Sequence, residues 1–256
     1  MINVLIFGAN GRMGKKVKAA LSEKSDMRAS CGVDIKEDFT DPEFPVYDNI
    51  SEATEKCGVP NVLIDFSSRF SLETVLTYAE KFCVPAVLCA TGYTEEDEEK
   101  VKAASEKIAL FRSANMSVGV NVLIRLVKQA AAALEGFDIE IVEKHHNKKV
   151  DAPSGTAKMI AEEIKNVLPE KYFVYGRNGI TGKRDKNEIG LHAVRGGNIV
   201  GDHDVIFAGE NEVITLSHSA SDRALFADGA VKAAKFISGK NNGLYDMNDL
   251  LEEAGF

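Results

Sequence analysis

The segment Glu143–Ala157 gathers residue types that could move protons and bind an anion. His145 and Lys149 have acid–base capacity, since an imidazole titrates near neutral pH and an ammonium is a mobile cation. Ser154 is a typical N-cap, so a helix should begin at Gly155–Thr156 with backbone N–H groups that attract a carboxylate or phosphate. The segment therefore predicts a site for an anionic substrate.

Regular elements should lie on both sides of this segment. The residues of Phe137–Glu143 alternate between apolar and polar, which is typical of a strand, and Ala157, Ile160 and Ile164 recur at helical spacing. Pro153 should force the residue before it into an extended conformation. The cluster is therefore expected in a loop between a strand and a helix.

Other uses of these residues are possible. Adjacent histidines such as His145 and His146 are often surface residues, and lysine runs are often solvated. Against this, the basic cluster adjoins a predicted helix start. A metal site is the rival use of histidine, but the remaining histidines show no ligand spacing, and three nearby lysines would repel a divalent ion. We expect no metal.

A second motif lies at the start of the chain. The apolar run Ile2–Phe7 predicts a buried strand, Gly8–Gly14 follows, and a helical stripe of apolar residues comes next. This order is the context of a dinucleotide-binding turn, although the spacing Gly-x-x-Gly-x-x-Gly departs from the strict pattern and also fits an ordinary glycine-rich turn. Asp34 ends the next predicted strand and could accept hydrogen bonds from ribose hydroxyls; otherwise it is a solvated carboxylate.

Asp34 also bears on the choice of nicotinamide. Its carboxylate should repel a 2′-phosphate, while Arg12 and Lys36 are placed to soften that repulsion. We expect use of both NADH and NADPH, with NADH at least as good.

Strands and helices alternate over the first half of the chain, which predicts an α/β fold with a Rossmann-like, doubly wound parallel sheet. Residues at the carboxyl ends of such strands line the cofactor crevice of open α/β sheets. Here they are Ser67–Ser68, Cys89–Gly92 and Ser113–Met116.

The later half predicts a second α+β domain with an open mixed sheet. Its strand-like runs are Glu188–Arg195, Ile199–Phe207 and Glu212–Ser219, joined by two segments with hairpin turn chemistry, Gly196–Asn198 and Gly209–Asn211. A final helix should return the chain to the first domain. We expect a dinucleotide-binding domain of residues 1–116 and 224–256, and a substrate-binding and oligomerisation domain of residues 117–223. One helix cannot cover both faces of the second sheet, so self-association is expected.

Composition excludes several classes of protein. A formal charge of −8 over 256 residues argues against a nucleic-acid or anionic-membrane surface, although a local basic pocket is allowed. The four cysteines contain no Cys-x-x-Cys pair, so buried free thiols are expected and suit a reducing cytoplasm. No secretory signal or membrane-length apolar run is present.

Taken together, these segments resemble the dihydrodipicolinate reductase (4-hydroxy-tetrahydrodipicolinate reductase) family of the diaminopimelate route to lysine. The block Glu143–Ala157 is highly specific, and the likeness spans nearly the whole chain. The other matching segments are Gly8–Gly14, Asp65–Ser67, Ala90–Tyr93, Ala114–Asn121, Arg195–His203 and Gly243–Met247. The resemblance implies an NAD(P)H-dependent oxidoreductase of the cytoplasm that forms a homotetramer.

The resemblance also implies roles for individual residues. His145 takes the family's general acid–base role, Lys149 is its proton donor, and substrate binds to His146, Gly155 and Thr156. The cofactor's pyrophosphate would lie on Gly8, Ala9, Asn10, Gly11, Arg12 and Met13, its ribose on Asp34, and its nicotinamide end near Cys89, Ala90, Thr91, Ser113, Ala114, Asn115 and Met116. Many members have Gly-Thr-Thr-Gly at the position of Cys89–Gly92. Many also have Arg at the position of Ile35, and the lack of that cation in this chain weakens the case for NADPH.

The implied chemistry agrees with the residues. The substrate is a small cyclic imine with two carboxylates, so one can bind at the helix start and cationic side chains can hold the other. Hydride adds to the conjugated ring, and His145 or Lys149 can supply the proton that completes the reduction. Two alternatives stay open: a related NAD(P)-dependent dehydrogenase of another small carboxylic acid, and a protein that senses NAD(H) without turnover.

Overall fold

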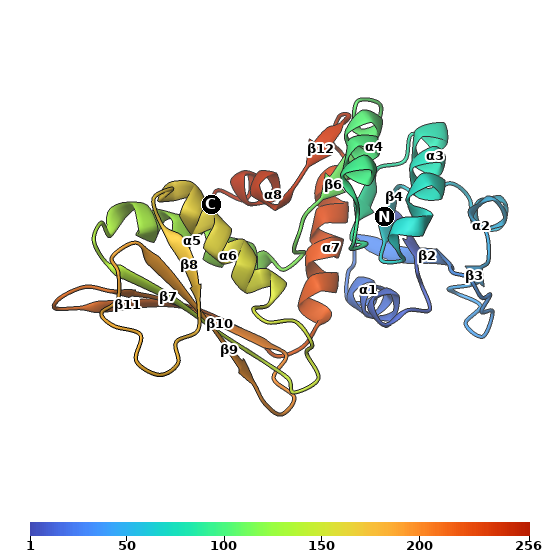
Figure 1. Cartoon of the computed structure of the whole chain (residues 1–256). Helices are drawn as coiled ribbons and strands as arrows, with labels where there is room; N and C mark the ends of the chain where they lie inside the picture. Colours follow the sequence, from blue (N-terminus) through green and yellow to red (C-terminus); the bar gives the residue numbers. More distant parts are fainter. The chain divides into compact units, whose positions relative to one another are not determined.

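The computed structural model describes all 256 residues and divides into two compact units, each described separately here (Figure 1). The first unit comprises Met1–Val118 and Ala224–Phe256, and the second comprises Gly119–Arg223. The second unit is therefore inserted into the chain of the first.

Seven strands form the sheet of the first unit, and every neighbouring pair in it is parallel. In spatial order they are β12 (Gly243–Tyr245), β6 (Ala109–Arg112), β5 (Ala86–Leu88), β4 (Val62–Asp65), β1 (Ile2–Phe7), β2 (Met27–Val33) and β3 (Val46–Tyr47). The strand order runs outward from β1 in both directions, which is the doubly wound arrangement predicted from the sequence. The last strand, β12, pairs with β6, so the end of the chain completes this sheet.

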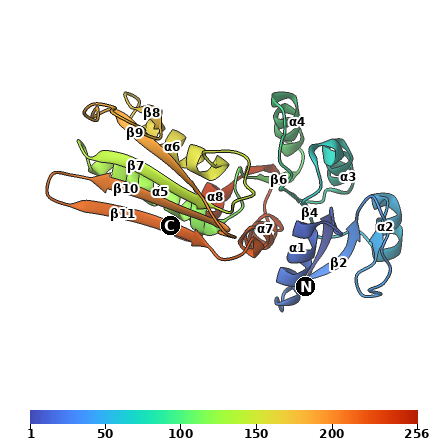
Figure 2. The same ribbon diagram turned by 60° about the horizontal axis from the view of Figure 1, so that its bottom comes forward.

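Helices cover both faces of the first sheet (Figure 2). They are α1 (Arg12–Ser22), α2 (Ile50–Cys57), α3 (Leu72–Phe82), α4 (Glu95–Ser105), α7 (Ala224–Ile237) and α8 (Met247–Glu253), with a short 3₁₀ turn at Arg69–Ser71. Strand β1 sends Val4 and Ile6 into the core formed with α1 and α7, and it sends Leu5 and Phe7 into the core formed with α2, α3 and α4. Burial on both faces explains why the residues from Val4 to Phe7 are all apolar.

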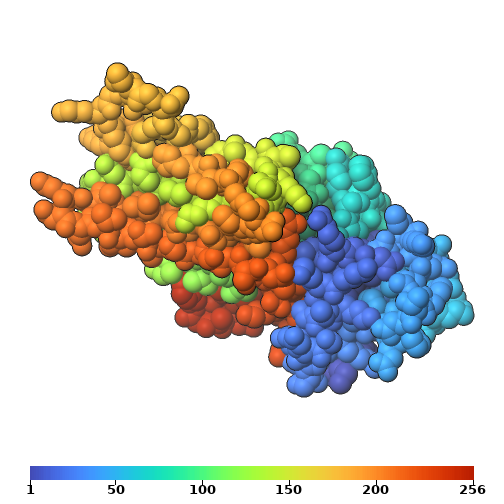
Figure 3. All heavy atoms as spheres, turned by 90° about the horizontal axis from the view of Figure 1, so that it is seen from below, coloured from blue at the N-terminus to red at the C-terminus, as the bar shows by residue number.

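The second unit contains the expected mixed sheet, but with five strands, since the short strand β8 was not predicted. In spatial order these are β11 (Val213–Ala220), β10 (Gly201–Ala208), β7 (Asp138–His145), β9 (Glu188–Arg195) and β8 (Tyr172–Tyr175). The helices α5 (Val118–Ala133) and α6 (Gly155–Val167) share a core with one face of this sheet. In the space-filling view the β10–β11 hairpin and the loop between β8 and β9 project from the body of this unit (Figure 3).

One predicted hairpin is wrong. Strands β9 and β10 do not pair, because β7 lies between them, parallel to β9 and antiparallel to β10. The turn Gly196–Asn198 instead contacts the chain after β7: Gly196 N donates to His145 O (2.9 Å) and Asn147 N donates to Gly197 O (3.2 Å). The second predicted hairpin is confirmed, since β10 and β11 are antiparallel neighbours and Gly209 N donates to Glu212 O.

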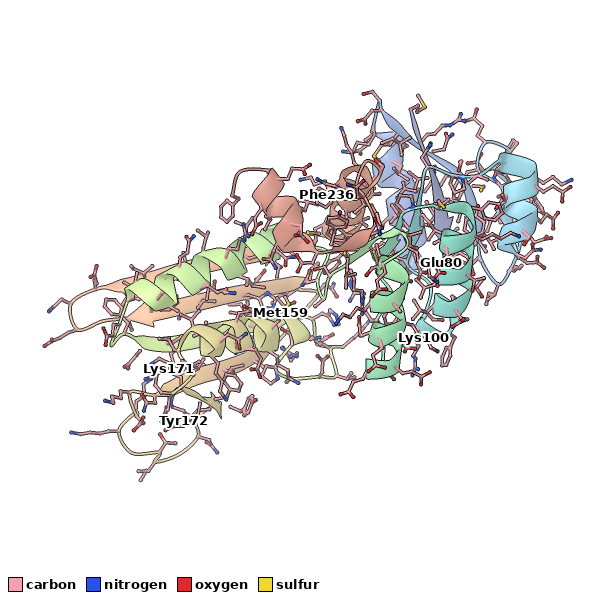
Figure 4. All side chains as sticks on the ribbon, turned by 90° about the horizontal axis from the view of Figure 1, so that it is seen from above. Glu80, Lys100, Met159, Lys171, Tyr172 and Phe236 are labelled. Atoms are coloured by element: carbon pink, nitrogen blue, oxygen red, sulfur yellow. The ribbon has the colours of Figure 1, made fainter.

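Several surface features complete the description. Glu80 of α3 and Lys100 of α4 line a shallow groove of about 590 Å³ between these helices (Figure 4), and no predicted site residue lines it. All four cysteines are free thiols as expected, but only Cys31 and Cys89 are buried and Cys83 is exposed. No helix has the length and apolar character needed to cross a bilayer.

Candidate active site

Strand β7 places a carboxylate and an imidazole on its core-facing side. Ile139, Ile141, Glu143 and His145 alternate as the buried residues of this strand, so the last two continue the hydrophobic row toward its carboxyl end. Nδ1 of His145 lies 2.6 Å from Oε2 of Glu143. The Glu143 side chain is almost fully buried, whereas His145 retains a small exposed fraction.

Arg195, from the end of β9, binds both oxygens of Glu143. Its Nη1 donates to Oε2 and its Nη2 donates to Oε1, each at 2.7 Å, and Nη2 also donates to Asp151 O. The backbone N–H of Ser154 donates to Oε1 of Glu143 at 3.0 Å. Burial alone would raise the pKa of the Glu143 carboxyl, but Arg195, His145 and the Ser154 N–H outweigh burial and hold the pKa below its usual value. The carboxyl is therefore ionised at neutral pH.

The loop after β7 carries Lys149. Its Nζ lies 2.7 Å from Oδ1 of Asp151, and its backbone N–H donates to His146 O. The peptide bond between Ala152 and Pro153 is cis. The loop thus returns the chain from β7 to the start of α6.

The start of α6 has the predicted cap. Oγ of Ser154 accepts a hydrogen bond from Ala157 N (3.1 Å) and lies 3.0 Å from Nε2 of His203 on β10. Burial, with the charge of His145, lowers the pKa of His203 to about 4, so its ring is neutral at neutral pH. The position that a Cβ atom on Gly155 would occupy has nothing within 4 Å. A small side chain at Gly155 would therefore meet no protein atom.

His146 is the third predicted residue of this region. Burial and the neighbouring charges of Arg223, His145 and the loop lysines lower its pKa, which favours a neutral ring. A neutral ring can donate from one nitrogen and accept at the other. The structure thus brings His145, His146, Lys149 and the Gly155–Thr156 helix start into one loop region of the second unit.

The glycine turn of the first unit is built by its own packing. Gly8 has φ of +79°, and a Cβ atom there would lie 2.9 Å from the Phe66 and Ser67 backbone after β4. A Cβ atom on Gly14 would lie 2.3 Å from Gly8 O. The N-cap of α1 is Gly11, which offers no side-chain acceptor, so the first N–H groups of this helix have no side-chain cap. Such a helix start fits a pyrophosphate.

Asp34 lies beside this turn, at the end of β2. One carboxylate oxygen accepts from Asn10 N and the other accepts from Ile35 N, each at 2.8 Å. Asn10 Nδ2 also donates to Lys36 O. The carboxylate has further lone pairs for ribose hydroxyls, but it also ties β2 to the turn, a structural role that the sequence did not reveal.

The remaining predicted cofactor residues follow β5 and β6. Cys89 and Ala90 are buried, and Thr91 is exposed. Met116 belongs to the core, and Ser113 and Asn115 make turn contacts: Ser113 Oγ donates to Asn115 O, and Asn115 Oδ1 accepts from Ser117 N. Ala114 is exposed. Burial raises the pKa of the Cys89 thiol well above its usual value, so this side chain offers no thiolate chemistry.

A buried carboxyl also lies at this end of the sheet. Asp65, the last residue of β4, accepts from the backbone and hydroxyl of Ser67, while its Oδ2 has no partner. Burial raises the pKa of Asp65 to about 6. Arg112 donates to Ala90 O and stacks on Tyr93, 4.2 Å from the ring centroid.

Sequence reasoning gave no individual role to Glu143, Arg195 and His203. The available signal was Glu143 itself, an acid at a core-facing position of an alternating strand, because a buried carboxylate requires partners. Its partner Arg195 lies 52 residues further along the chain on β9, and His203, the partner of Ser154, lies 49 residues beyond that serine on β10. Among possible metal ligands, three carboxylates, those of Glu37, Asp48 and Glu52, lie within 4.8 Å of one another, and none is a predicted site residue.

Comparisons with known proteins cover nearly the whole chain. Residues 2–116 match the family model described as dihydrodipicolinate reductase, N-terminus, and residues 119–251 match that described as dihydrodipicolinate reductase, C-terminus. A protein of Caldanaerobacter subterraneus subsp. tengcongensis named 4-hydroxy-tetrahydrodipicolinate reductase is 54% identical over 99% of both chains. One of Clostridium tetani with the same name is 46% identical over 98% of this chain and 97% of its own.

A solved structure is similar as well. The dipicolinate-bound dihydrodipicolinate reductase of Paenisporosarcina sp. TG-14 superposes with a TM-score of 0.82 at 25% identity, covering 97% of this chain and 99% of that one. A probable dehydrogenase from Thermotoga maritima shares the fold at a TM-score of 0.62 and 12% identity, covering 97% of this chain and 92% of its own.

Proposed function

The chain belongs to the dihydrodipicolinate reductase family, and from that premise we propose which of its residues carry the reaction. The protein is an NAD(P)H-dependent oxidoreductase that reduces 4-hydroxy-tetrahydrodipicolinate, by way of dihydrodipicolinate, to tetrahydrodipicolinate on the route to diaminopimelate and lysine. The observation that carries the residue assignment is the contact of His145 with the buried Glu143, in the loop region that also holds Lys149 and the start of α6.

The two units bind different ligands. Residues 1–116 and 224–256 bind the dinucleotide, and residues 117–223 bind the substrate and mediate self-association. The uncapped start of α1 supports the first assignment: Gly8, Ala9, Asn10, Gly11, Arg12 and Met13 hold the pyrophosphate, with Asp34 on the ribose. The nicotinamide end contacts the segments Cys89–Thr91 and Ser113–Met116, largely through backbone, since Cys89, Ala90 and Met116 are buried.

The substrate's two carboxylates bind in the second unit. One is held at the start of α6 by Gly155 and Thr156, where the helix dipole favours negative charge. His146 donates a hydrogen bond from its neutral ring, and nearby cations hold the second carboxylate. The absence of protein atoms within 4 Å of the Cβ position of Gly155 supports this assignment.

Proton transfer falls to His145 and Lys149. The bound nicotinamide supplies the hydride. His145 Nε2 or Lys149 Nζ delivers the proton that completes the reduction, and the surrounding loop holds both groups in place. Lys149 must leave Asp151, or share its proton with the substrate, to do so.

NADH is used at least as well as NADPH. Asp34 places a negative charge where a 2′-phosphate would lie, and the adjacent Ile35 is fully exposed and supplies no cation. Arg12 and Lys36 allow some use of NADPH.

The protein works as a homotetramer in the cytoplasm. Exposed apolar side chains of the second sheet support assembly: Val194 of β9, and Val213 and Ile214 of the edge strand β11, are 45%, 62% and 36% exposed, respectively. Exposed apolar side chains on a sheet favour association with a further copy. Light scattering of the purified protein tests this, and a monomer at micromolar concentration would contradict it.

A single assay tests the proposed function. Loss of nicotinamide absorbance is followed with freshly generated 4-hydroxy-tetrahydrodipicolinate, and with other small carbonyl or imine carboxylic acids as controls. Turnover confined to the first substrate supports the proposal. Turnover with another acid would indicate a related dehydrogenase, and NADH binding without any turnover would indicate a sensor.

A further inference from the structure

Glu143 is an unusual group to find in a protein interior. Its side chain is only 1% exposed, and nearly every hydrogen-bonding position on its two oxygens is used. It accepts from both terminal nitrogens of Arg195, from Ser154 N and, at 2.6 Å, from the His145 ring. A buried carboxylate with partners on three segments of the chain suggests more than a contribution to stability, because such ion pairs often add little of it.

The contact with His145 fixes the position of a proton. An ionised carboxylate can only accept hydrogen bonds, and Arg195 holds the pKa of Glu143 below its usual value. Nδ1 of His145 must therefore be the donor in this contact. A neutral His145 then carries its proton on Nδ1 and presents Nε2 as a base, and a protonated ring presents Nε2–H as an acid.

The opposite side of the ring is also held. A Cβ atom on Gly201 of β10 would lie 3.0 Å from Nε2 of His145, so a larger residue there would crowd the ring. The neutral His203 packs edge-on against it, with ring centroids 5.3 Å apart. The ring of His145 is thus fixed in both tautomer and orientation.

The same carboxylate controls the start of α6. Oε1 of Glu143 accepts from Ser154, the N-cap residue, while Arg195 also donates to Asp151 O in the preceding loop. One buried ion pair therefore connects the acid–base histidine with the helix start that receives the substrate carboxylate.

We propose that Glu143, held by two hydrogen bonds from Arg195, is a positioning residue. It sets the His145 tautomer and fixes the position of His145 relative to the start of α6. This inference rests on the proposed function of His145. Glu143 does not touch substrate; it acts through the imidazole, as a carboxylate does when it orients a general base.

The test combines Glu143→Gln with His145→Ala and the double variant. The Gln side chain can still accept from Ser154 N, but its amide can donate to Nδ1 and so move the His145 proton to Nε2. We expect Glu143→Gln to lower kcat by about 10²-fold, the scale of a misplaced proton-transfer group, with KM and NADH affinity within about threefold. In the His145→Ala background the same change should lower kcat by less than about threefold. Equal losses in both backgrounds would overturn the proposal.

A matched control lies on the same strand. Glu140 contacts Nε2 of His192 at 2.6 Å and pairs with Arg177, but on the other face of β7. Glu140→Gln should leave kcat unchanged in an assembly of the same size, so a comparable loss there would point to a general effect of removing a strand carboxylate. Arg195→Lys is a second Glu143-directed variant: it keeps a cation but loses the two-pronged contact, and it should lower kcat only when His145 is present.

Nitrogen-15 NMR of labelled histidine reads the tautomer without turnover. At a pH where the ring is neutral, the His145 signal, assigned by its loss in His145→Ala, should show the proton on Nδ1 in the wild type and on Nε2 in Glu143→Gln. A wild-type proton on Nε2 would overturn the inference even if the reductase assay succeeds. An absence of reductase activity would instead contradict the proposed function, leaving the NMR result to judge the role of Glu143.

Discussion

The ammonium of Lys149 lies 2.7 Å from Oδ1 of Asp151, two residues further along the same loop. The pKa of Asp151 is lowered, first by this hydrogen bond, so its carboxyl is ionised at neutral pH. The proposed proton donor thus contacts an ionised carboxylate within its own loop. A substrate carboxylate that competes for Lys149 could release it from Asp151.

Removing either proton-transfer group should slow the chemistry without weakening cofactor binding. We expect His145→Ala or Lys149→Ala to lower kcat by about two to four orders of magnitude, the usual scale for a lost general acid. The NADH dissociation constant, measured by fluorescence titration, should stay unchanged, because both residues belong to the second unit. Near-normal turnover in both single variants would exclude these assignments.

A methyl group on Gly155 at the start of α6 should weaken substrate binding. Gly155 has ordinary helical φ, and a methyl group there meets no protein atom, so Gly155→Ala should fold normally. A carboxylate at the helix start would lose its close approach, and KM for the substrate should rise about tenfold or more while NADH affinity is retained. Gly239→Ala, at an equally open position after α7, is the control. An unchanged KM in Gly155→Ala would place the carboxylate elsewhere.

A cation next to Asp34 should shift the cofactor ratio. Ile35 is fully exposed beside the carboxylate, so Ile35→Arg adds a partner for a 2′-phosphate without disturbing the core. We expect kcat/KM for NADPH to rise about tenfold and that for NADH to change by less than about threefold. Ile180→Arg, at another fully exposed position, controls for added charge. A wild-type enzyme that strongly prefers NADPH would contradict the assigned role of Asp34.

The neutral, buried His203 should make the protein less stable in mild acid. Burial lowers its folded-state pKa to about 4 from 6.5, so the unfolded chain binds the extra proton between these values and stability falls as pH drops through this window. The loss through this one group is on the order of 3 kcal/mol. Urea unfolding of His203→Gln should show a correspondingly smaller loss between pH 7 and pH 4. If the unfolding free energies of wild type and variant fell by the same amount between pH 7 and pH 4, His203 would not be kept neutral by burial.

Asp65 should have the opposite effect on the pH dependence of stability: the protein should become less stable as the pH rises. Burial raises its folded-state pKa from 3.8 to about 6, so the folded state binds the extra proton and stability from this group falls as pH rises across that interval. Relative to wild type, Asp65→Asn should therefore gain on the order of 3 kcal/mol in unfolding free energy between pH 4 and pH 7. Calorimetry at the two pH values measures this difference. If the difference in unfolding free energy between Asp65→Asn and the wild type were the same at both pH values, Asp65 would ionise at its ordinary pKa in the folded protein.

Much of the fold was predictable because its signals are local. Strand β1 is apolar on both faces, and the Thr94–Asp97 capping box marks the start of α4. Short elements such as β3 and β12, of two and three residues, carry no usable periodicity. The false hairpin at Gly196–Asn198 has a similar origin: turn residues indicate a reversal but not which strand the chain pairs with afterwards.

The candidate site was also predictable only where its residues are close in sequence. His145, Lys149 and the helix start are close in sequence, so their spacing and the family resemblance indicated them together. The contacts of Glu143 depend on β7 lying between β9 and β10, which no local pattern specifies. Arg195 and His203 reach the β7–α6 region only through that pairing.

The return of the chain to the first sheet also has a consequence for synthesis on the ribosome. Helix α7 supplies Ala227, Ala230, Val231, Ala233, Ala234 and Ile237 to the core that also holds Val4 and Ile6 of β1, and β12 adds the last strand beside β6. A nascent chain that has emerged only as far as Arg223 has one face of its first sheet without this helix. The earliest strands to leave the exit tunnel must therefore wait for the latest residues before they are fully buried, and chaperones that shield apolar surface would be needed most during that interval.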